Sequence, residues 1–557
     1  PCSYFAAGIR NPSRFCSQCP KMLHELGHTG HINELASPSP NGKEVIRLRK
    51  QSFIAGTMIL LAAGVVNRIL GFVPRIALPR IVGPEGVGLY QMGYPFMILV
   101  LTLLTSGVPL AVAKLVAEAS SERNEHKVRS ILVNALSLTV SLGFLFAAIS
   151  YLAAPWIASH LFTDARVYQT FICMTPIIPI AAVSAVLRGY FQGLHNMIPT
   201  ASSQVAETLC RIAGMLLFAW LLLPYGVEWA AAGAMIGVVL GEVCGMAVLL
   251  FHLNQHRTAA VMKTEYRRTS NFRRLFSISV PVTASRLVGS ASYMLEAVFI
   301  TQSLAAAGIA TAVATAQYGA LQGMVIPILL LPGALTTSLS VSLVPSLSEA
   351  AARGDMRTIH KRLYQSIRLA LVTGAPFAVV MFVLAEPICY YLYGNAEVGK
   401  MLKMMAPAAV FLYFQGPLQA TLQALDRPGN ALINTFFGSV VKLTLIVLLA
   451  SRPQWGIYGA VFASNINIIL VTLLHWHTVS RMLKFSIKTA DYWKTGMAAA
   501  LMAFCCHMVM EGDWIGMPFI RFLSACAAGG VLYLLCIVWL KLVDRDDLSR
   551  IPWIGKK

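Results

Sequence analysis

The sequence predicts an all-α polytopic membrane protein of about fourteen transmembrane helices, built as two six-helix lobes in a parallel repeat followed by two C-terminal helices. Of its 557 residues, 57% are apolar and 12% are charged, against about 25% charged residues in soluble domains. Apolar windows of about 20 residues, each long enough to cross a hydrocarbon core of about 30 Å, recur from Phe53 to Leu542. Since these runs lack the alternation of strands, we expect helices to satisfy the backbone hydrogen bonds in lipid.

The apolar windows divide the chain into spans and connecting segments. The predicted spans cover residues 53–81, 89–116, 130–154, 167–190, 200–223, 229–251, 275–303, 317–347, 363–385, 401–424, 431–450, 456–479, 492–510 and 518–541. The predicted domains are a disordered or non-native tail (1–50), an N-lobe (51–255), a cytoplasmic linker (256–274), a C-lobe (275–480), and helices 13 and 14 with a cytoplasmic tail (481–557).

The net charge of +20 indicates membrane topology, because the basic residues fall in alternate loops. The intervening loops hold little more than Arg166, Lys400 and Arg452. Basic residues near helix ends stay on the cytoplasmic side, so both termini and the 252–274 loop are expected inside. The alternative explanation, a nucleic-acid-binding patch, would be made of Arg267, Arg268, Arg273 and Arg274. The topological pattern favours a protein without a nucleic-acid partner.

Cysteine usage does not indicate a disulfide framework. Cys16 and Cys19 precede His24, His28 and His31 at spacings that a zinc site could use. Because this segment begins without Met and contains a loop-like Ser-Pro-Ser-Pro stretch, we interpret it as a tail and expect no metal and no cofactor. The remaining cysteines are expected to pack as small residues in apolar helices: Cys173, Cys210, Cys244, Cys389, Cys505, Cys506, Cys526 and Cys536.

An internal repeat at an offset of 231 residues relates the two lobes. At this offset residues 117–119 (Ala-Glu-Ala) meet residues 348–350 (Ser-Glu-Ala), and Gln192 meets Gln423. Six helices per repeat give both units the same orientation, so an axis along the membrane normal relates them. Substrate sites of transporters lie between such repeats, which predicts a central cavity.

Ionisable residues at membrane depth are the candidates for function. Each costs about 2.5–3.5 kcal/mol at the centre of a lipid-facing helix, so we expect these residues to face a cavity or one another. The residues predicted to bind substrate in the central cavity are Arg68, Arg75, Glu207, Arg211, Arg286 and Lys442. The candidate coupling acids are Glu242 and Glu296, with Glu207 as a third acid that could carry a proton.

The spacing of these residues supports a shared cavity. Arg68, Gly71 and Arg75 recur at helical intervals and form one stripe on the first helix. Glu207 and Arg211 are one turn apart and can form an ion pair. Guanidinium groups bind phosphate oxygens bidentately, so the excess of cations predicts an anionic substrate such as a diphosphate. The alternative is that these charges form ion pairs that stabilise the lobes.

The sequence carries no Walker loop, no HExxH and no Gly-x-Ser-x-Gly motif, so we expect a protein that is not an enzyme. Prolines within the predicted spans bend helices and are candidate hinges, with ordinary packing as the alternative. They are Pro176, Pro179, Pro281, Pro327 and Pro332.

The first two spans carry a recognisable pattern at residues 67–72 (NRILGF), 80–90 (RIVGPEGVGLY) and 114–118 (KLVAE). This pattern resembles the stage V sporulation protein B family, in the polysaccharide transporter branch of the multidrug, oligosaccharidyl-lipid and polysaccharide flippase superfamily. The resemblance implies a bacterial plasma-membrane flippase of spore formers that acts on undecaprenyl-diphosphate-linked sugars by alternating access during spore-cortex peptidoglycan synthesis.

Related lipid II flippases carry the Arg-x-Leu-Gly-Phe pattern found here at 68–72, and their helices 13 and 14 form a groove for the lipid tail. This chain departs from them in its eighth span, which has Gln317 and Gln322 but no arginine, and in the displacement of Arg75 by one residue.

The expected function is therefore translocation of a lipid-linked oligosaccharide or peptidoglycan precursor across the bacterial cytoplasmic membrane. The expected partners are the lipid-linked glycan, membrane lipids and glycan polymerases. Two alternatives are a multidrug extruder of the same superfamily, which should expose acids to cationic drugs, and a non-transporting scaffold for envelope enzymes.

Overall fold

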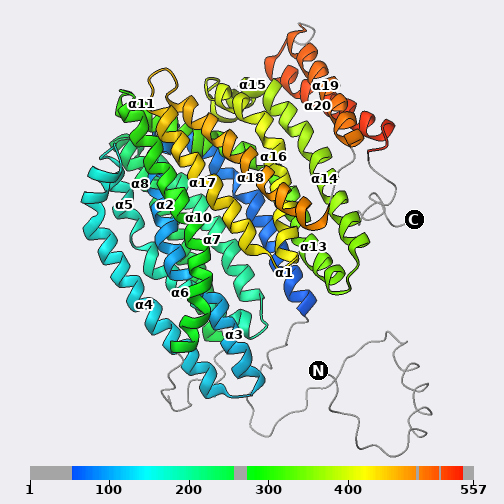
Figure 1. Cartoon of the computed structure of the whole chain (residues 1–557). Coiled ribbons are helices and arrows are strands. Elements are labelled where there is room, and N and C mark those ends of the chain that lie inside the picture. The colour runs from blue at the N-terminus through cyan, green and yellow to red at the C-terminus, as the bar shows by residue number, and fades with distance from the viewer. Residues whose placement is uncertain (1–52, 256–271, 485–488, 513–515, 543–557) are drawn as a thin grey trace, which may run out of the picture. The chain divides into compact units, whose positions relative to one another are not determined.

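The computed structural model describes residues 53–255, 272–484, 489–512 and 516–542 (Figure 1). The chain divides into two units, residues 1–49 and Lys50–Lys557, and every described residue belongs to the second. The described residues form helices and no strand. Ten helical stretches among them are long and apolar enough to cross a membrane. This confirms the all-α polytopic fold. The predicted tail, with its zinc-like spacing, lies outside the described residues, as does most of the linker.

We refer to the helices before the linker as the N-lobe (Figure 1). They are α1 (Phe53–Leu70), α2 (Phe72–Thr105), α3 (Val108–Ser121), α4 (Glu125–Trp156), the π-helical turn η2 (Ile157–Leu161), α5 (Val167–Met174), α6 (Ile177–Gly193), α7 (Ile198–Leu222), the 3-10 turn η3 (Leu223–Tyr225) and α8 (Val227–Gln255).

We refer to the helices after the linker as the C-lobe and a C-terminal pair. The C-lobe contains α10 (Phe272–Ala306), α11 (Thr311–Gly319), the π-helix η4 (Ala320–Val325), α12 (Ile326–Leu330), α13 (Gly333–Ala352), α14 (Met356–Val383), α15 (Ala385–Tyr393), α16 (Val398–Ala424), α17 (Pro428–Ala450) and α18 (Ile457–Leu483). The C-terminal pair is α19 (Thr489–Glu511) and α20 (Pro518–Trp539).

The first predicted span is not one continuous helix. α1 ends at Leu70 and α2 begins at Phe72, so the predicted stripe from Arg68 to Arg75 is interrupted at Gly71. Further along, Gly83 is the non-helical residue inside α2, with φ 69° and ψ 177°. Glycine adopts a positive φ without the clash that a Cβ would cause. Gly83 therefore marks the change from the first predicted span to the second.

The eighth predicted span, 317–347, is also divided. It runs through α11, η4, α12 and α13, with Pro327 near the start of α12 and Pro332 just before α13. Proline lacks the N–H that a continuous helix needs, and a π-helix within an α-helix often occurs at a functional site. Of the candidate hinge prolines, Pro176 likewise stands between α5 and α6, whereas Pro281 lies inside the continuous α10.

The lobes meet where α2 crosses α11, and the crossing follows the predicted repeat. A Cβ on Gly88 would lie 2.1 Å from the carbonyl oxygen of Thr315, and a Cβ on Gly319 would lie 2.1 Å from that of Pro84. Gly319 is 231 residues after Gly88, and Thr315 is 231 residues after Pro84. The two close approaches are therefore reciprocal, as expected for a two-fold relation between repeats.

A polar contact one turn further along joins another equivalent pair. Gln91 donates a hydrogen bond from Nε2 to the carbonyl oxygen of Gln322, 231 residues later, over 3.4 Å. Tyr318 donates from its hydroxyl to the carbonyl oxygen of Gln91 over 3.4 Å. The contact between α2 and the α11–η4 segment thus combines close backbone packing with hydrogen bonds.

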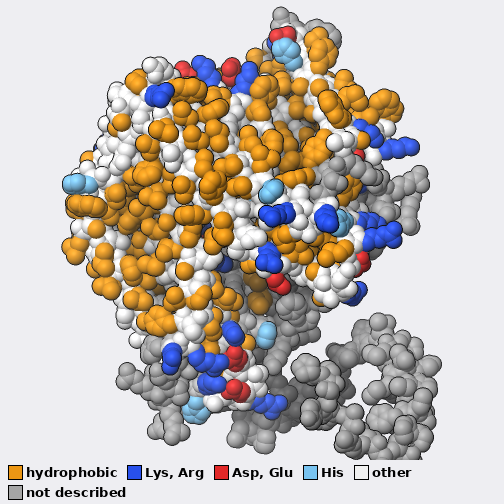
Figure 2. Space-filling model, viewed as in Figure 1, with side chains coloured by type: hydrophobic (Ala, Val, Ile, Leu, Met, Phe, Trp, Pro, Cys, Tyr) orange, Lys and Arg blue, Asp and Glu red, His pale blue; other side chains and the backbone are white. Residues whose placement is uncertain are grey.

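The surface in Figure 2 agrees with a membrane protein. Apolar side chains cover the region of α4, α10 and α17 on this face, and Lys and Arg side chains gather near α3. Large exposed apolar residues include Phe144 on α4 and Phe436 on α17. An apolar patch of this extent is unusual on a soluble monomer and suits contact with lipid.

Candidate substrate cavity

A cavity of about 390 Å³ lies against α2, α7 and α8 of the N-lobe. Its polar lining includes Arg75, Tyr90, Gln91, Tyr94, Glu207, Thr208, Arg211 and Glu242, and its apolar lining includes Leu78, Met97, Ile98, Ile177, Met215 and Val238. Gly323 of η4 also reaches the cavity, so the C-lobe contributes to its wall. Four of the predicted site residues, two cations and two acids, therefore share one chamber.

Three glycines on α8 bring α7 close enough to form one side of this cavity. Gly237, Gly241 and Gly245 recur every four residues, and small residues at this spacing let membrane helices approach closely. A Cβ on Gly241 would lie 2.5 Å from Arg211 Cβ, and a Cβ on Gly245 would lie 3.1 Å from Glu207 Cβ. The tight packing sets Glu242 on α8 beside the two charged residues of α7.

Arg188 on α6 joins the two acids. Its Nη2 lies 2.8 Å from Glu207 Oε2 and 3.6 Å from Glu242 Oε1. Arg211 Nη1 lies 3.1 Å from Glu207 Oε1, which confirms the predicted pair one turn apart on α7. Glu207 is thus bound by two guanidinium groups, while Glu242 has one longer contact.

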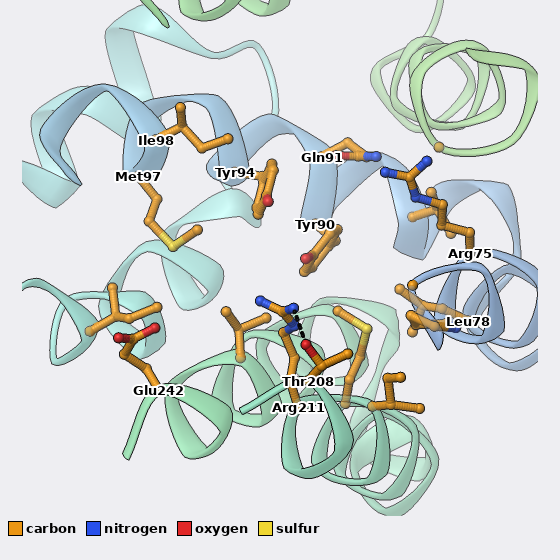
Figure 3. Close-up of a pocket in the computed structure, with 18 of the residues that line it drawn as sticks. Arg75, Leu78, Tyr90, Gln91, Tyr94, Met97, Ile98, Thr208, Arg211 and Glu242 are labelled. Atoms are coloured by element: carbon orange, nitrogen blue, oxygen red, sulfur yellow. Dashed lines mark hydrogen bonds between the residues drawn. The ribbon is translucent and has the colours of Figure 1, made fainter. Parts of the chain in front are cut away.

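Arg211 is the most accessible member of this charge network. Its side chain is 36% exposed, against 13% for Glu207 and 20% for Arg188. Its second nitrogen, Nη2, donates to Thr208 Oγ1 over a long 3.4 Å. In Figure 3 Arg211 extends from α7 toward Tyr90 of α2, and Arg75 lies on the opposite side of the view from Glu242. An anion between Arg75 and Arg211 would meet guanidinium groups from two helices.

The structure places the other predicted cations elsewhere. Arg68 and Arg286 are exposed and are not among the residues that line this cavity. Lys442 Nζ lies 2.6 Å from Glu296 Oε2, and both side chains are largely buried. Gln322 Nε2 donates to the other oxygen of Glu296 over 3.3 Å. The alternative of a lobe-stabilising ion pair therefore describes Lys442 and Glu296.

The prediction from sequence did not include Arg188. Its charge lies near the end of the fourth predicted span, and its partners are on two other helices. The Gly237-Gly241-Gly245 pattern predicts a close helix neighbour for α8, but that neighbour is α7 and not α6, so no local pattern identified Arg188. Among the described residues, no group of His, Cys, Asp and Glu is arranged to hold a metal ion.

A polar cluster joins the lobes beside the Gly88 crossing. Thr315 Oγ1 donates to Asp164 Oδ2 over 2.8 Å. Arg166 donates to both oxygens of Asp164, from Nε over 3.0 Å and from Nη2 over 2.8 Å, and lies 2.7 Å from Glu85. Burial alone would raise the pKa of Asp164, but the hydrogen bonds from Arg166 and Thr315 outweigh it and hold the pKa below its usual value.

A second contact between the lobes involves α15. Arg80 Nε donates to the carbonyl oxygen of Leu392 over 2.7 Å, and Arg80 Nη2 donates to that of Tyr391. These carbonyls end α15, where a cation is favoured by the helix dipole. The ring of Tyr391 packs against Phe519 and Phe522 of α20, with centroid distances of 5.0 and 5.3 Å. α15 therefore contacts both the N-lobe and the C-terminal pair.

An apolar pocket of about 360 Å³ lies between α14, α16 and α19. Its lining is almost wholly apolar and includes Leu371, Ala375, Val379, Phe382, Val410 and Ala499. A pocket of this kind suits a hydrocarbon chain, because most of its lining is apolar, with Tyr492 and Thr495 as its polar side chains.

Comparisons with known proteins support a transporter fold. Residues 53–351 match the family model described as Polysaccharide biosynthesis protein, and residues 292–448 match the MatE model. Stage V sporulation protein B of Bacillus subtilis (strain 168) is 40% identical over 514 residues, which cover 91% of this chain and 99% of that protein. Lipid II flippase MurJ of the same organism is 26% identical over 541 residues, which cover 90% of this chain and 98% of that protein.

Solved structures share the fold. The inward closed conformation of lipid II flippase MurJ gives a TM-score of 0.66 at 17% identity, over 87% of this chain and 99% of that chain. The inward-facing conformation of a multidrug resistance MATE family transporter gives 0.59 at 15% identity, over 77% of this chain and 98% of that chain.

Proposed function

The chain belongs to the stage V sporulation protein B family of polysaccharide biosynthesis proteins, and from this premise we propose that it is a flippase for a lipid-linked glycan precursor. The cargo is a polyprenyl-diphosphate-linked oligosaccharide or peptidoglycan precursor. The protein moves it across the bacterial cytoplasmic membrane by alternating access and changes no covalent bond in it.

The observation that carries this proposal is the pair of guanidinium groups that face one cavity from two helices, Arg75 on α2 and Arg211 on α7. With Arg188 behind them, the three arginines and the two acids Glu207 and Glu242 give a net charge of +1 (3 − 2). Guanidinium forks bind phosphate oxygens bidentately, and the low dielectric of the surroundings strengthens the attraction. A diphosphate therefore suits the chamber.

The apolar pocket between α14, α16 and α19 supports a lipid-linked cargo. A polyprenyl chain would lie in this mainly apolar pocket while the diphosphate and glycan occupy the cavity. Chamber and pocket together provide for a cargo with an anionic head and a hydrocarbon tail.

The positive-inside pattern supports an orientation with both termini in the cytoplasm. The end of the helices that carries Gly83, Asp164 and Thr311 is then the outer end. The contacts of Asp164 with Thr315 and of Gly88 with the α11 backbone close the lobes together at this end. A cargo would reach the cavity from the cytoplasmic side in this state.

Reconstitution tests the proposal. Purified protein in liposomes should move a fluorescent polyprenyl-diphosphate sugar between leaflets. Arg211→Ala should lower the rate about ten- to hundredfold, since a hydrogen bond to a charged group is worth about 1.5–3 kcal/mol. Arg353→Ala is the matched control, because Arg353 is exposed and pairs with Glu349 on the surface. Equal rates for wild type and Arg211→Ala would overturn the proposal, as would transport of cationic drugs without transport of the labelled lipid.

A further inference from the structure

Glu242 differs from the other buried acids in how its charge is balanced. The residue is 9% exposed, it lines the cavity, and its ion-pair partner Arg188 is 3.6 Å away. Glu207 instead has contacts of 2.8 and 3.1 Å with two arginines. A carboxylate that is buried with little compensation favours its neutral form. Of the two acids in the cavity, Glu242 is therefore the one that can take up a proton.

The second candidate coupling acid, Glu296, has a fixed ionic partner in Lys442. Glu296 contacts Lys442 over 2.6 Å and accepts a hydrogen bond from Gln322 on its other oxygen. It is not among the residues that line the cavity. Its charge is therefore balanced by a fixed partner and does not respond to a ligand in the chamber.

Building on the proposed function, we propose that Glu242 binds a proton when an anion binds at Arg211, so that the diphosphate cargo and one proton occupy the cavity together. The proton comes from water in the open cavity and is held on the Glu242 carboxyl group. The cargo keeps its own charge, but cargo and proton together move one negative charge fewer across the membrane than the cargo alone would. The proton returns from Glu242 to water when the cargo leaves the cavity on the other side.

The charges around Glu242 give the reason for this linkage. Arg188 of α6, Glu207 and Arg211 of α7, and Glu242 itself sum to zero when Glu242 is ionised. They sum to +1 when it is protonated. A negative ligand repels the ionised form and stabilises the protonated one. By linkage, protonation must strengthen anion binding by the same factor.

Within the part of the chain that the structure describes, the cavity lining holds no acid other than Glu207 and Glu242 that could take up the proton. Ser184 of α6 faces it with a neutral hydroxyl. α2 contributes Tyr90, Tyr94 and, further along, Arg75 to the cavity. α5, which packs against α8, contains no Asp, Glu, His, Lys or Arg. Glu242 is therefore the group proposed to bind the proton near neutral pH, and Arg188 and Arg211 stay charged beside it.

Calorimetric titration of the full-length protein tests the linkage. The probe is a short-chain prenyl-diphosphate N-acetylglucosamine, whose diphosphate diester stays fully ionised near neutral pH. Titration in two buffers with different enthalpies of protonation counts the protons taken up with each bound probe. Wild type should take up as much as about one proton, and its affinity should fall as pH rises, by up to about tenfold per pH unit. Glu242→Gln should bind the probe without proton uptake.

Matched variants separate the outcomes. Glu228→Gln alters an acid on the same helix that does not line the cavity, and it should behave as wild type. Glu242→Asp keeps a titratable group, so the infrared band of a protonated carboxyl group should still appear on binding but at a shifted frequency. This measurement decides the matter even if Glu242→Gln does not fold. Binding without proton uptake by wild type, or unchanged uptake in Glu242→Gln, would overturn the inference alone. A wild type that does not bind the probe would overturn the proposed function and the inference with it.

Discussion

The Thr315 hydroxyl donates a hydrogen bond to the buried carboxylate of Asp164 over 2.8 Å and so joins α11 of the C-lobe to the N-lobe. The carbonyl oxygen of the same Thr315 is the atom that Gly88 approaches. Thr315 therefore contributes its hydroxyl group to one contact and its carbonyl oxygen to the other. We call these contacts, together with the Gly319 approach to Pro84, the outer seal, after the orientation proposed above.

The outer seal should weaken in acid. Because the hydrogen bonds hold the pKa of Asp164 below its usual value, Asp164 adds stability that is fully present above its unfolded pKa of about 3.9 and is lost as pH falls through the folded value. Asp164→Asn should lower stability at neutral pH by about 1–3 kcal/mol, since Arg166 loses one of its two charged partners and keeps Glu85. In this variant the free energy of unfolding should also fall less steeply as the pH decreases. Thermal unfolding over a pH series measures both effects, and an acid loss as steep as that of wild type would contradict this role.

The glycine crossing should not tolerate a methyl group. Gly88→Ala and Gly319→Ala each place a Cβ 2.1 Å from a carbonyl oxygen, and overpacking of this kind costs about 1–3 kcal/mol. Both variants should lose stability and flip the labelled lipid more slowly. Gly64→Ala is the control, because no atom lies within 4 Å of its added Cβ. If the two crossing variants matched Gly64→Ala, the backbones would not pack as closely as described.

The Lys442–Glu296 pair should act as a structural unit. Lys442→Met or Glu296→Gln alone leaves a buried charge without its partner, which costs about 3–5 kcal/mol. The double variant should recover much of this loss, because no unpaired charge remains. Thermal unfolding of the four proteins in a double-mutant cycle gives the coupling energy. Strictly additive effects of the two changes would mean that the pair does not interact in the folded protein.

Arg80 should stabilise the end of α15. Arg80→Ala removes the donor to the carbonyl groups of Leu392 and Tyr391, and a cation at a helix C-terminus is worth about 0.3–1 kcal/mol. Amide hydrogen exchange of the Ala385–Tyr393 peptide should accelerate by a corresponding few-fold factor. Arg452→Ala, in another loop on the same side, should leave that exchange unchanged. Equal exchange in all three proteins would remove Arg80 from this role.

Hydropathy predicted the membrane fold because lipid leaves long apolar segments few options other than helices. The Glu207–Arg211 pair was also predictable, since residues four apart lie on one face of a helix. Such local relations depend on helix geometry alone, which the sequence determines directly.

Contacts between helices were harder to predict. Lys442 and Glu296 are 146 residues apart, and Arg188 reaches acids on two other helices. Hydropathy does not determine which faces meet. Arg68, Gly71 and Arg75 were expected on one stripe; Gly71 and Arg75 line the cavity and Arg68 does not.

The reciprocal approach of Gly88 and Gly319 has the form of an isologous dimer interface, in which each partner presents the same patch to the other. Here one polypeptide carries both patches, so their association does not depend on protein concentration. A chain cut between α8 and α10 would retain two self-complementary halves. Their assembly would then become a bimolecular equilibrium that dilution reverses.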